Sequence, residues 1–211
     1  QIASDKQALF PDVNDYGDVV FEWRIKPDGL EKDYVAFVES GASDVTWAVE
    51  LWQTYNVVVY PPFINNEQWV SVLGVVYDGD YYGMRHFLLK DGVIYFDGWI
   101  RELRYKELPE KVYGQITDRH FAGGWVFDEV YFEVRKIPDG ALVWSFKLPE
   151  AQCNTLGHRI RLAEPYVAFS APTASVDVGL GVMKKVTLSV KVVTITGKPV
   201  RNVQITVEPI T

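Results

Sequence analysis

The chain has 211 residues, of which 48% are hydrophobic and 14% aromatic, and it carries one Cys, two Met and a formal net charge of −7. This composition excludes a disordered chain, and the length allows one sizeable core without disulfides or metal staples. The acidic balance argues against binding to nucleic acid or anionic membranes, since both need a basic surface. No apolar run approaches the ~20 residues of a membrane-spanning helix, so we expect no membrane insertion.

The first 17 residues show no clear hydrophobic period, and we expect them to form an extended N-terminal arm. The chain begins with Gln1 rather than Met, which fits a mature product after removal of a secretory signal. The expected location is therefore extracellular or at the cell surface.

From residue 18 onward, apolar and polar residues alternate. In the first run, Val19, Phe21 and Trp23 share one face, while Glu22 and Arg24 share the other, as in a half-buried strand. Similar runs predict strands at about 34–39, 45–60, 69–77, 84–89, 93–96, 99–106, 111–117, 125–137, 141–148, 158–170, 175–183, 186–196 and 200–208.

Turn signals rich in Asp and Gly separate these runs: Asp78-Gly79-Asp80, Asp91-Gly92, Asp97-Gly98, Gly123-Gly124 and Pro138-Asp139-Gly140. Short strands joined by tight turns predict an all-β, antiparallel β-sandwich of the jelly-roll type over residues 18–183. Helical signal is confined to two short candidates, residues 65–73 and 149–153.

Two short sequences recur in the chain. Residues 21–29 read FEWRIKPDG and residues 132–140 read FEVRKIPDG, while YVAF occurs at 34–37 and again at 166–169. Two strand–turn units of the same design would explain these repeated sequences. Convergence on common hairpin residues is the alternative, since no third copy exists.

The charge is divided unevenly along the chain. Residues 184–211 hold five basic side chains against Glu208, a net +4, whereas the other 183 residues hold 16 basic and 27 acidic side chains, a net −11. We expect this basic tail to dock on an acidic surface of its own chain or of a neighbour. A solvated edge strand with scattered lysines is the alternative.

The tail reads VTLSVKVVTITGKPVRNVQITVEPIT from residue 186, two alternating runs around a Gly-Lys-Pro turn. It resembles the opening hairpin of prealbumin-like or carboxypeptidase-regulatory-type modules of surface proteins, which implies a C-terminal β-hairpin. A two-stranded hairpin alone is marginal in water, so it must pair with the main domain or with another subunit. The candidate subunit contacts are its apolar positions Val190, Val192, Ile195, Val203, Ile205 and Val207.

Catalytic signals are sparse. Glu129, Tyr131 and Glu133 share a strand face and could supply the paired carboxylates of a glycosidase, but the E-x-D-x-x-E pattern of jelly-roll glucanases is absent. The Glu-x-Arg sequence at 133–135 recurs at 22–24, which predicts a surface charge ladder instead. We therefore expect no enzymatic activity.

Other reaction chemistry has little support. Cys153 and His158 leave a Cys–His nucleophile formally open, although a lone Cys is more simply a buried filler. The three histidines show no metal-binding spacing, and Ser40 and Ser170 lack the context of a nucleophile elbow. We expect no cofactor.

The abundant aromatic residues suggest a carbohydrate ligand, because aromatic ring faces stack on sugar rings. The candidate carbohydrate-binding residues are Trp52, Trp69, Tyr81, Tyr82 and Trp99, and the alternative is that the aromatics fill the core between two sheets. Asp78 and Asp80 could contribute ligands to Ca²⁺, but they more simply form a polar turn.

These patterns favour an extracellular structural subunit of a surface filament, sheath or layer. Copies of the chain would form a homopolymer by β-strand addition. Low Cys and Met with abundant Val, Tyr and Trp also suits a thermophile. The alternatives are a carbohydrate-binding module or glucanase-like jelly roll with a polysaccharide partner, and a viral coat or fibre protein.

Overall fold

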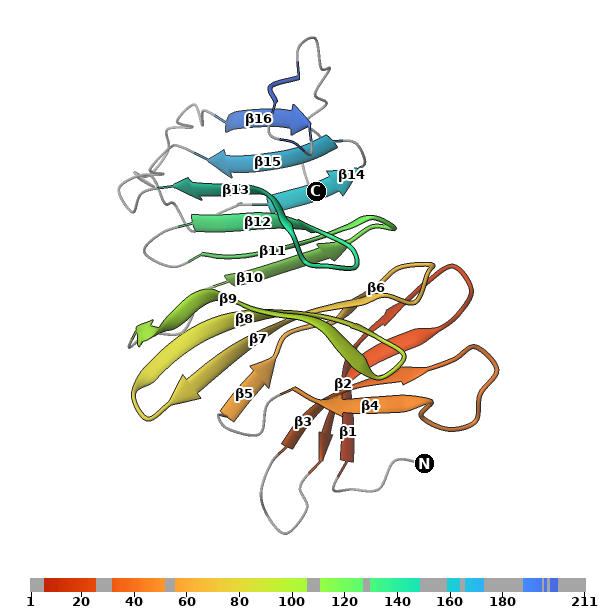
Figure 1. The fold of residues 1–211 in the computed structure, drawn as a ribbon. Helices are drawn as coiled ribbons and strands as arrows, with labels where there is room; N and C mark the ends of the chain where they lie inside the picture. Colours follow the sequence, from red (N-terminus) through yellow and green to blue (C-terminus); the bar gives the residue numbers. More distant parts are fainter. Residues whose placement is uncertain are drawn as a thin grey trace, which may run out of the picture.

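The computed structural model describes residues 6–25, 32–51, 56–105, 111–126, 130–148, 159–163, 166–172, 188–194, 196 and 198–200. These residues form β-strands joined by turns, and none of them lies in a helix (Figure 1), so the all-β class is confirmed. The helix candidate at 65–73 is a turn followed by a strand, and the one at 149–153 lies outside the described residues. Among the residues described, no helix is long and apolar enough to cross a membrane.

The described strands form four antiparallel sheets, which we name A to D. Sheet A contains β1 (Lys6–Val13), β2 (Val19–Ile25), β3 (Lys32–Val38) and β4 (Trp47–Glu50), in that order. Sheet B contains β5 (Asn56–Val59), β7 (Val70–Asp78), β8 (Tyr81–Lys90) and β9 (Val93–Tyr105), with the short β6 (Phe63–Ile64) also paired to β7. Sheet C contains β10 (Lys111–Ile116), β11 (His120–Val126), β12 (Val130–Lys136) and β13 (Leu142–Leu148). Sheet D contains β14 (Arg159–Ala163), β15 (Tyr166–Pro172) and β16 (Leu188–Thr194).

The order of strands within each sheet follows the order of the chain, apart from β6. The antiparallel sandwich is confirmed, and its described sheets are meanders rather than the interleaved sheets of a jelly roll. Tight turns explain this order at the β7–β8 and β8–β9 connections, because a two-residue turn can only join strands that lie side by side. At the β8–β9 turn, Asp91 and Gly92 have φ values of 52° and 74°, the positive pair that a two-residue hairpin turn of type I′ requires.

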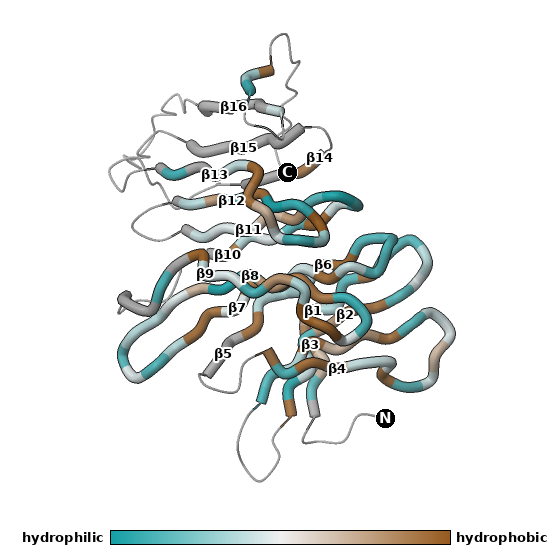
Figure 2. The backbone as a smooth tube through the Cα atoms, viewed as in Figure 1, coloured by the Kyte–Doolittle hydropathy of each residue, from teal (hydrophilic) through white to brown (hydrophobic). Residues whose placement is uncertain are grey.

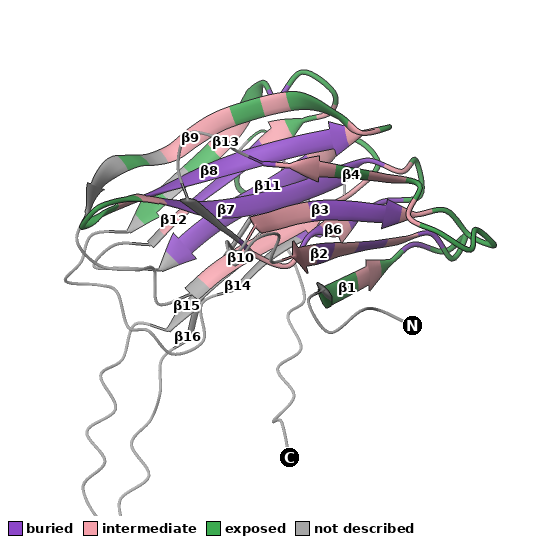
Figure 3. Cartoon of the chain, turned by 90° about the horizontal axis from the view of Figure 1, so that it is seen from below, coloured by how far each residue is buried: buried purple, intermediate pink, exposed green. Residues whose placement is uncertain are grey.

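Sheet B lies between sheets A and C, so the core has three layers rather than the expected two. Every residue from 70 to 76 on β7 and from 83 to 89 on β8 is buried, as Figure 3 shows by colour. Successive side chains of a strand point to opposite faces, so a strand buried at every position is covered on both sides.

Each face of sheet B has its own apolar core. Toward sheet A, Val72 and Phe87 pack with Val20, Val35 and Phe37. The core toward sheet C contains Leu73, Val75, Met84 and Trp125, and beside it Leu88 and Phe121. Burying one such side chain stabilises the fold by roughly 1.5–3 kcal/mol, so the two cores supply much of the driving force for folding.

The side chain of Gln115 on β10 joins sheet C to sheet D. Its Nε2 donates to the carbonyl oxygen of Leu162 at 3.2 Å, and its Oε1 accepts from the Leu162 amide at 2.7 Å. The glutamine amide thus gives β14 the two hydrogen bonds that a neighbouring strand would give it.

The first and last described strands are edge strands among those that the structure describes. The expected N-terminal arm contains β1, which pairs with β2 at one edge of sheet A. The expected basic tail contains β16, which pairs with β15 and is an edge of sheet D among the described strands, while residues 201–211 lie outside that part. In Figure 1, β1 and β16 lie at opposite ends of the molecule.

Candidate functional site

The aromatic residues predicted to bind sugar are spread over sheet B. Trp69 immediately precedes β7, whereas Tyr81 and Tyr82 begin β8, and the register of this hairpin places these two groups at opposite ends. Trp69 is buried, Tyr82 and Trp99 are half-buried, and Tyr81 is exposed. Trp52 lies outside the described residues.

Cations cover two of these indole rings. The guanidinium carbon of Arg85 lies 4.6 Å from the ring centroid of Trp99, and the ammonium of Lys90 lies 5.1 Å from that of Trp69. The rings of Tyr95 and Trp69 also pack in a T-shaped arrangement, with their centroids 4.9 Å apart. A ring face that packs against a cation offers less surface for stacking on a sugar.

The residues considered for metal binding and nucleophilic chemistry are only partly described by the structure. Asp78 and Asp80 are exposed at the β7–β8 turn. In the part of the chain that the structure describes, no three His, Cys, Asp or Glu side chains gather as a metal site would require. Cys153 and His158 fall outside that part.

Of the six predicted subunit contacts, two lie on a described strand. Val190 and Val192 belong to β16, opposite Ser170 and Ala168 of β15. The other four lie outside the described residues: Ile195, Val203, Ile205 and Val207.

The carboxylates of the two Glu-x-Arg sequences are buried, so the predicted surface ladder is wrong. Glu22 has 0% of its surface exposed and Glu133 has 1%. Arg24 lies 2.8 Å from Glu22, and the Nε of Arg135 lies 2.6 Å from Oε1 of Glu133. Each sheet flanking sheet B thus carries a buried carboxylate paired with the arginine two residues later.

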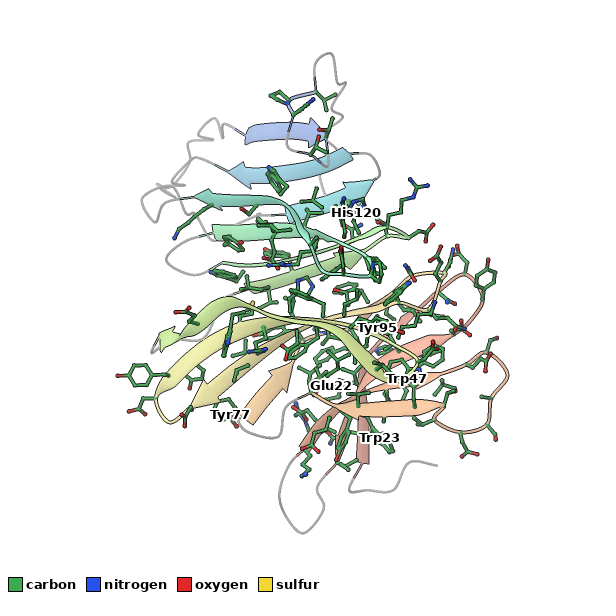
Figure 4. The ribbon with its side chains drawn as sticks, viewed as in Figure 1. Glu22, Trp23, Trp47, Tyr77, Tyr95 and His120 are labelled. Atoms are coloured by element: carbon green, nitrogen blue, oxygen red, sulfur yellow. The ribbon has the colours of Figure 1, made fainter. Side chains whose placement is uncertain are left out.

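The two copies of this motif serve different interfaces. Glu22 lies on the same strand face as Val20, which packs in the core between sheets A and B, and Figure 4 shows its side chain among the packed side chains there. Glu133 belongs to β12 and contacts sheet B. The second repeated sequence, YVAF, does not keep the same position relative to the first. One copy lies on β3, which is next to β2, whereas the other lies on β15, which is not next to β12.

Ser71, His86, Glu133, Arg135 and Tyr131 form a buried inter-sheet polar cluster between sheets B and C. The hydroxyl of Ser71 lies 2.9 Å from Nε2 of His86, whose Nδ1 lies 3.3 Å from Oε1 of Glu133. Arg135 donates to both carboxylate oxygens of Glu133, at 2.6 and 2.9 Å, and Tyr131 donates to Oε2 at 3.3 Å.

This arrangement fixes the tautomer of His86. An ionised Glu133 only accepts hydrogen bonds, so Nδ1 of the histidine carries the proton and Nε2 accepts the hydroxyl proton of Ser71. Burial lowers the pKa of His86, and this outweighs the hydrogen bond to Glu133, which raises it. The imidazole is therefore neutral at pH 7.

The carboxylate keeps its charge despite burial. Burial alone would raise the pKa of Glu133, but the hydrogen bonds from His86 and Arg135 outweigh it and hold that pKa below its usual value. Burial and the nearby Glu133 charge raise the pKa of Tyr131 to about 12, so this phenol stays protonated and donates. The cluster is thus a satisfied ion pair with neutral donors around it.

A glycine on the facing strand makes room for the imidazole. A Cβ at Gly123 of β11 would lie 2.8 Å from Cε1 of His86 and 2.8 Å from Cδ2 of Leu73. Real side-chain contacts are longer, so the close approach of sheets B and C requires glycine here. The Gly123-Gly124 pair, which the sequence presented as a turn signal, lies within β11.

The hydrogen bonds run in the order serine, histidine, carboxylate, as in a catalytic triad. Ser71 is 1% exposed and His86 is fully buried, however, so no substrate can reach the hydroxyl in this structure. Sequence reasoning missed this group because Ser71 and His86 lie on neighbouring strands and Glu133 is 47 residues further on. The geometry supports a structural role, holding two sheets together.

Three turns meet at one end of sheets A and B, around Asp18. Its buried carboxylate accepts hydrogen bonds from the Ser40 amide at 2.9 Å, from Asn14 Nδ2 at 2.9 Å and from Gln68 Nε2 at 3.0 Å. Burial alone would raise the pKa of Asp18, but these hydrogen bonds outweigh it and lower that pKa. The carboxylate therefore fixes the β1–β2 turn, the β3–β4 loop and the turn before β7 relative to one another.

We call this region the acidic end. Residues 7–19, 36–49 and 60–70 contain no Lys or Arg and six carboxylates: Asp12, Asp15, Asp18, Glu39, Asp44 and Glu67. Their turns lie on the right of Figure 1 and are largely hydrophilic in Figure 2.

No protein-family model matches the chain, and no curated protein matches it in sequence. Function must therefore be inferred from the geometry of this molecule.

Proposed function

We propose that the protein is a structural subunit of an extracellular filament, sheath or layer, and that copies join through the open edges of their sheets. The observation that carries this proposal is the position of β1 and β16, the first and last described strands. Among the described strands, each lies at the edge of a sheet, and the two are at opposite ends of the molecule (Figure 1). An edge strand presents N–H and C=O groups that a strand of another chain can pair with.

The placement of these edges favours an open chain of subunits. Contacts between two unlike ends of a molecule repeat head to tail, and they give a filament when the rotation between copies does not close a ring. In this proposal the C-terminal hairpin, with Val190 and Val192 on its described strand, is one of the two joining ends.

The three-layer core suits a subunit that must keep its shape under load. Sheet B is covered on both faces, and the buried ion pair of Glu133 and Arg135 ties sheet C to His86 of sheet B. Removing one member of such a pair would leave a buried group without its partner, which is costly. The sheets should therefore separate together rather than one at a time.

Enzymatic and sugar-binding functions have less support among the described residues. Ser71, which has the triad-like geometry, is buried, and cations pack on the rings of Trp69 and Trp99. Tyr81 is the one exposed ring among the four described candidates. A glycan array that shows strong binding by the full chain would favour the polysaccharide alternative.

Sedimentation velocity and electron microscopy of the full chain at rising concentrations test the proposal. We expect a series of oligomers that grows into linear or sheet-like assemblies. A chain without residues 186–211 should remain monomeric if it folds, which its circular dichroism would report. A full-length chain that stays monomeric at every concentration, or a truncated chain that assembles equally well, would contradict the proposal.

A further inference from the structure

We infer that an exposed apolar patch at the acidic end receives the basic C-terminal segment, residues 184–211, of a second copy. The patch consists of Phe10, Val13 and Tyr16, which are 53%, 60% and 68% exposed. This inference rests on the proposed function and deepens it, because it names the surface and the segment through which two copies join.

The three residues are large apolar side chains, close together along the chain, that the fold leaves uncovered. Phe10 and Val13 lie on β1, and Tyr16 follows in the turn to β2. Scattered apolar residues are normal on a protein surface, whereas three large exposed ones close together in the chain are a candidate contact site. Val93, Ile94 and Tyr95 at the start of β9 are a second such group, so charge, and not exposure alone, selects the first. The alternating Val203, Ile205 and Val207 of the basic segment offer side chains of matching character.

Local backbone geometry presents Phe10 to solvent. Its φ of 51° lies in the left-handed region that residues with a Cβ rarely adopt, and the pairing of β1 with β2 shifts register between Leu9 and Asp12. Bulges of this kind re-aim a side chain and recur at functional edges. Pro11 also lacks an N–H, so a backbone ladder on the free edge of β1 would be interrupted at this position.

Charge complementarity identifies the occupant. The three segments of the acidic end hold six carboxylates and no basic residue of their own, although Lys90 of β8 packs on Trp69 of the third segment, and the segment 184–211 carries the net charge of +4. Asp15 and Glu39 are exposed at the acidic end, so they can meet Lys198 and Arg201 of a neighbour. Opposite charges at a rim steer association and fix its register.

Hydrogen bonds within a single chain preorganise the acidic end. Asp12 accepts the amide of Ile64 at 2.9 Å, and Asn66 donates its side-chain amide to Asp15 at 2.7 Å. With Asp18 as a buried hub, these hydrogen bonds hold the rim in place. A preorganised surface loses less conformational entropy on binding.

A charge swap tests the inference. We expect the double variant Asp15→Lys, Glu39→Lys to need about tenfold more protein for half-maximal assembly, because like charges would then face each other. Lys198→Glu, Arg201→Glu should show a similar loss, and all four changes together should restore assembly. The matched control, Asp78→Lys with Asp80→Lys at the β7–β8 turn, makes the same change in charge away from the patch and should assemble as the parent chain does.

Each outcome separates this inference from the proposed function. If the parent chain assembles and the acidic-end variant assembles equally well, the inference fails while the proposed function stands. If the fourfold variant does not recover although its unfolding midpoint matches that of the parent chain, the proposed pairing is also wrong. If the parent chain never assembles, both fail together.

Discussion

His86 of sheet B donates a hydrogen bond from Nδ1 to Oε1 of Glu133 in sheet C, over 3.3 Å, in a fully buried position between the two sheets. Ser71 holds the opposite side of the imidazole and Arg135 holds the carboxylate. Such a network is stabilising only while every member keeps its partner. Four predictions concern these buried groups and the turn around Asp18.

Replacing Glu133 by Gln should destabilise the fold. The change removes the negative charge that pairs with Arg135, and it places the NH₂ group of the new amide against groups that themselves donate hydrogen bonds. Breaking a buried ion pair in this way costs roughly 3–5 kcal/mol. Urea unfolding followed by tryptophan fluorescence would measure the change in free energy of unfolding. The exposed Glu67→Gln is the matched control, and an equal effect of the two changes would contradict the role given to the cluster.

The fold should lose stability in mild acid. The pKa of buried His86 lies below its usual value of 6.5, so the unfolded chain takes up a proton near that pH while the folded chain does not. The stability that neutral His86 contributes is fully present above the pKa of this histidine in the unfolded chain. As the pH falls below that value, the free energy of unfolding decreases by up to about 1.4 kcal/mol per pH unit for one proton. The lowered pKa of Glu133 adds a further loss below its usual value of 4.5.

Urea unfolding at pH 7.5 and at pH 5.5 measures this effect. The variant His86→Gln cannot take up a proton at this position. It should be less stable than the parent chain at both pH values, but its free energy of unfolding should change less between pH 7.5 and pH 5.5. Equal pH dependence in the parent chain and the variant would show that another group is responsible.

A methyl group at Gly123 should push sheets B and C apart. The added Cβ would approach His86 and Leu73 to 2.8 Å, and overpacking of this kind typically costs about 1–3 kcal/mol. If the clash is the cause, Gly123→Ala should cost less in a Leu73→Ala background. Thermal unfolding of the two single variants and the double variant measures that coupling, and strictly additive effects would contradict the packing account.

Asp18→Asn should loosen the acidic end. The substitution puts an amide where the carboxylate now accepts hydrogen bonds from Ser40, Asn14 and Gln68, at a cost of roughly 1–3 kcal/mol. Asp44→Asn is the control, because that carboxylate is exposed in the same region. Hydrogen exchange should rise in the β1–β2 turn and the β3–β4 loop of the first variant alone, and unchanged protection there would rule out the role of Asp18 as a hub.

The strands could be predicted because their period and turn residues are local. The run starting at Val19 pairs as β2, and Asp91-Gly92 makes the predicted tight turn. The third layer was missed because the alternation of apolar and polar residues was taken to mean that each strand has only one buried face. The nearly unbroken apolar stretch at 70–76 was the available signal, since a strand covered on both sides has no polar face.

The inter-sheet polar cluster could not be found from spacing. Ser71 and His86 meet through the register of the β7–β8 hairpin, and Glu133 reaches them only because sheet C packs on sheet B. The repeated Phe-Glu-x-Arg sequence was the one usable sign. Its glutamate was assigned to the surface because charged side chains are seldom fully buried without a partner. The arginine two residues later is the partner that allows this glutamate to be buried.

Cross-linking between isotopically distinct copies tests the head-to-tail account most directly. Equal amounts of ¹⁴N- and ¹⁵N-labelled chain would be mixed under assembly conditions and treated with a zero-length carbodiimide reagent, which joins carboxylates to amines. The account predicts mixed-isotope peptide pairs that link Asp15 or Glu39 of one copy to Lys198 of another. Pairs drawn only from single copies, in samples that microscopy shows to be assembled, would contradict it.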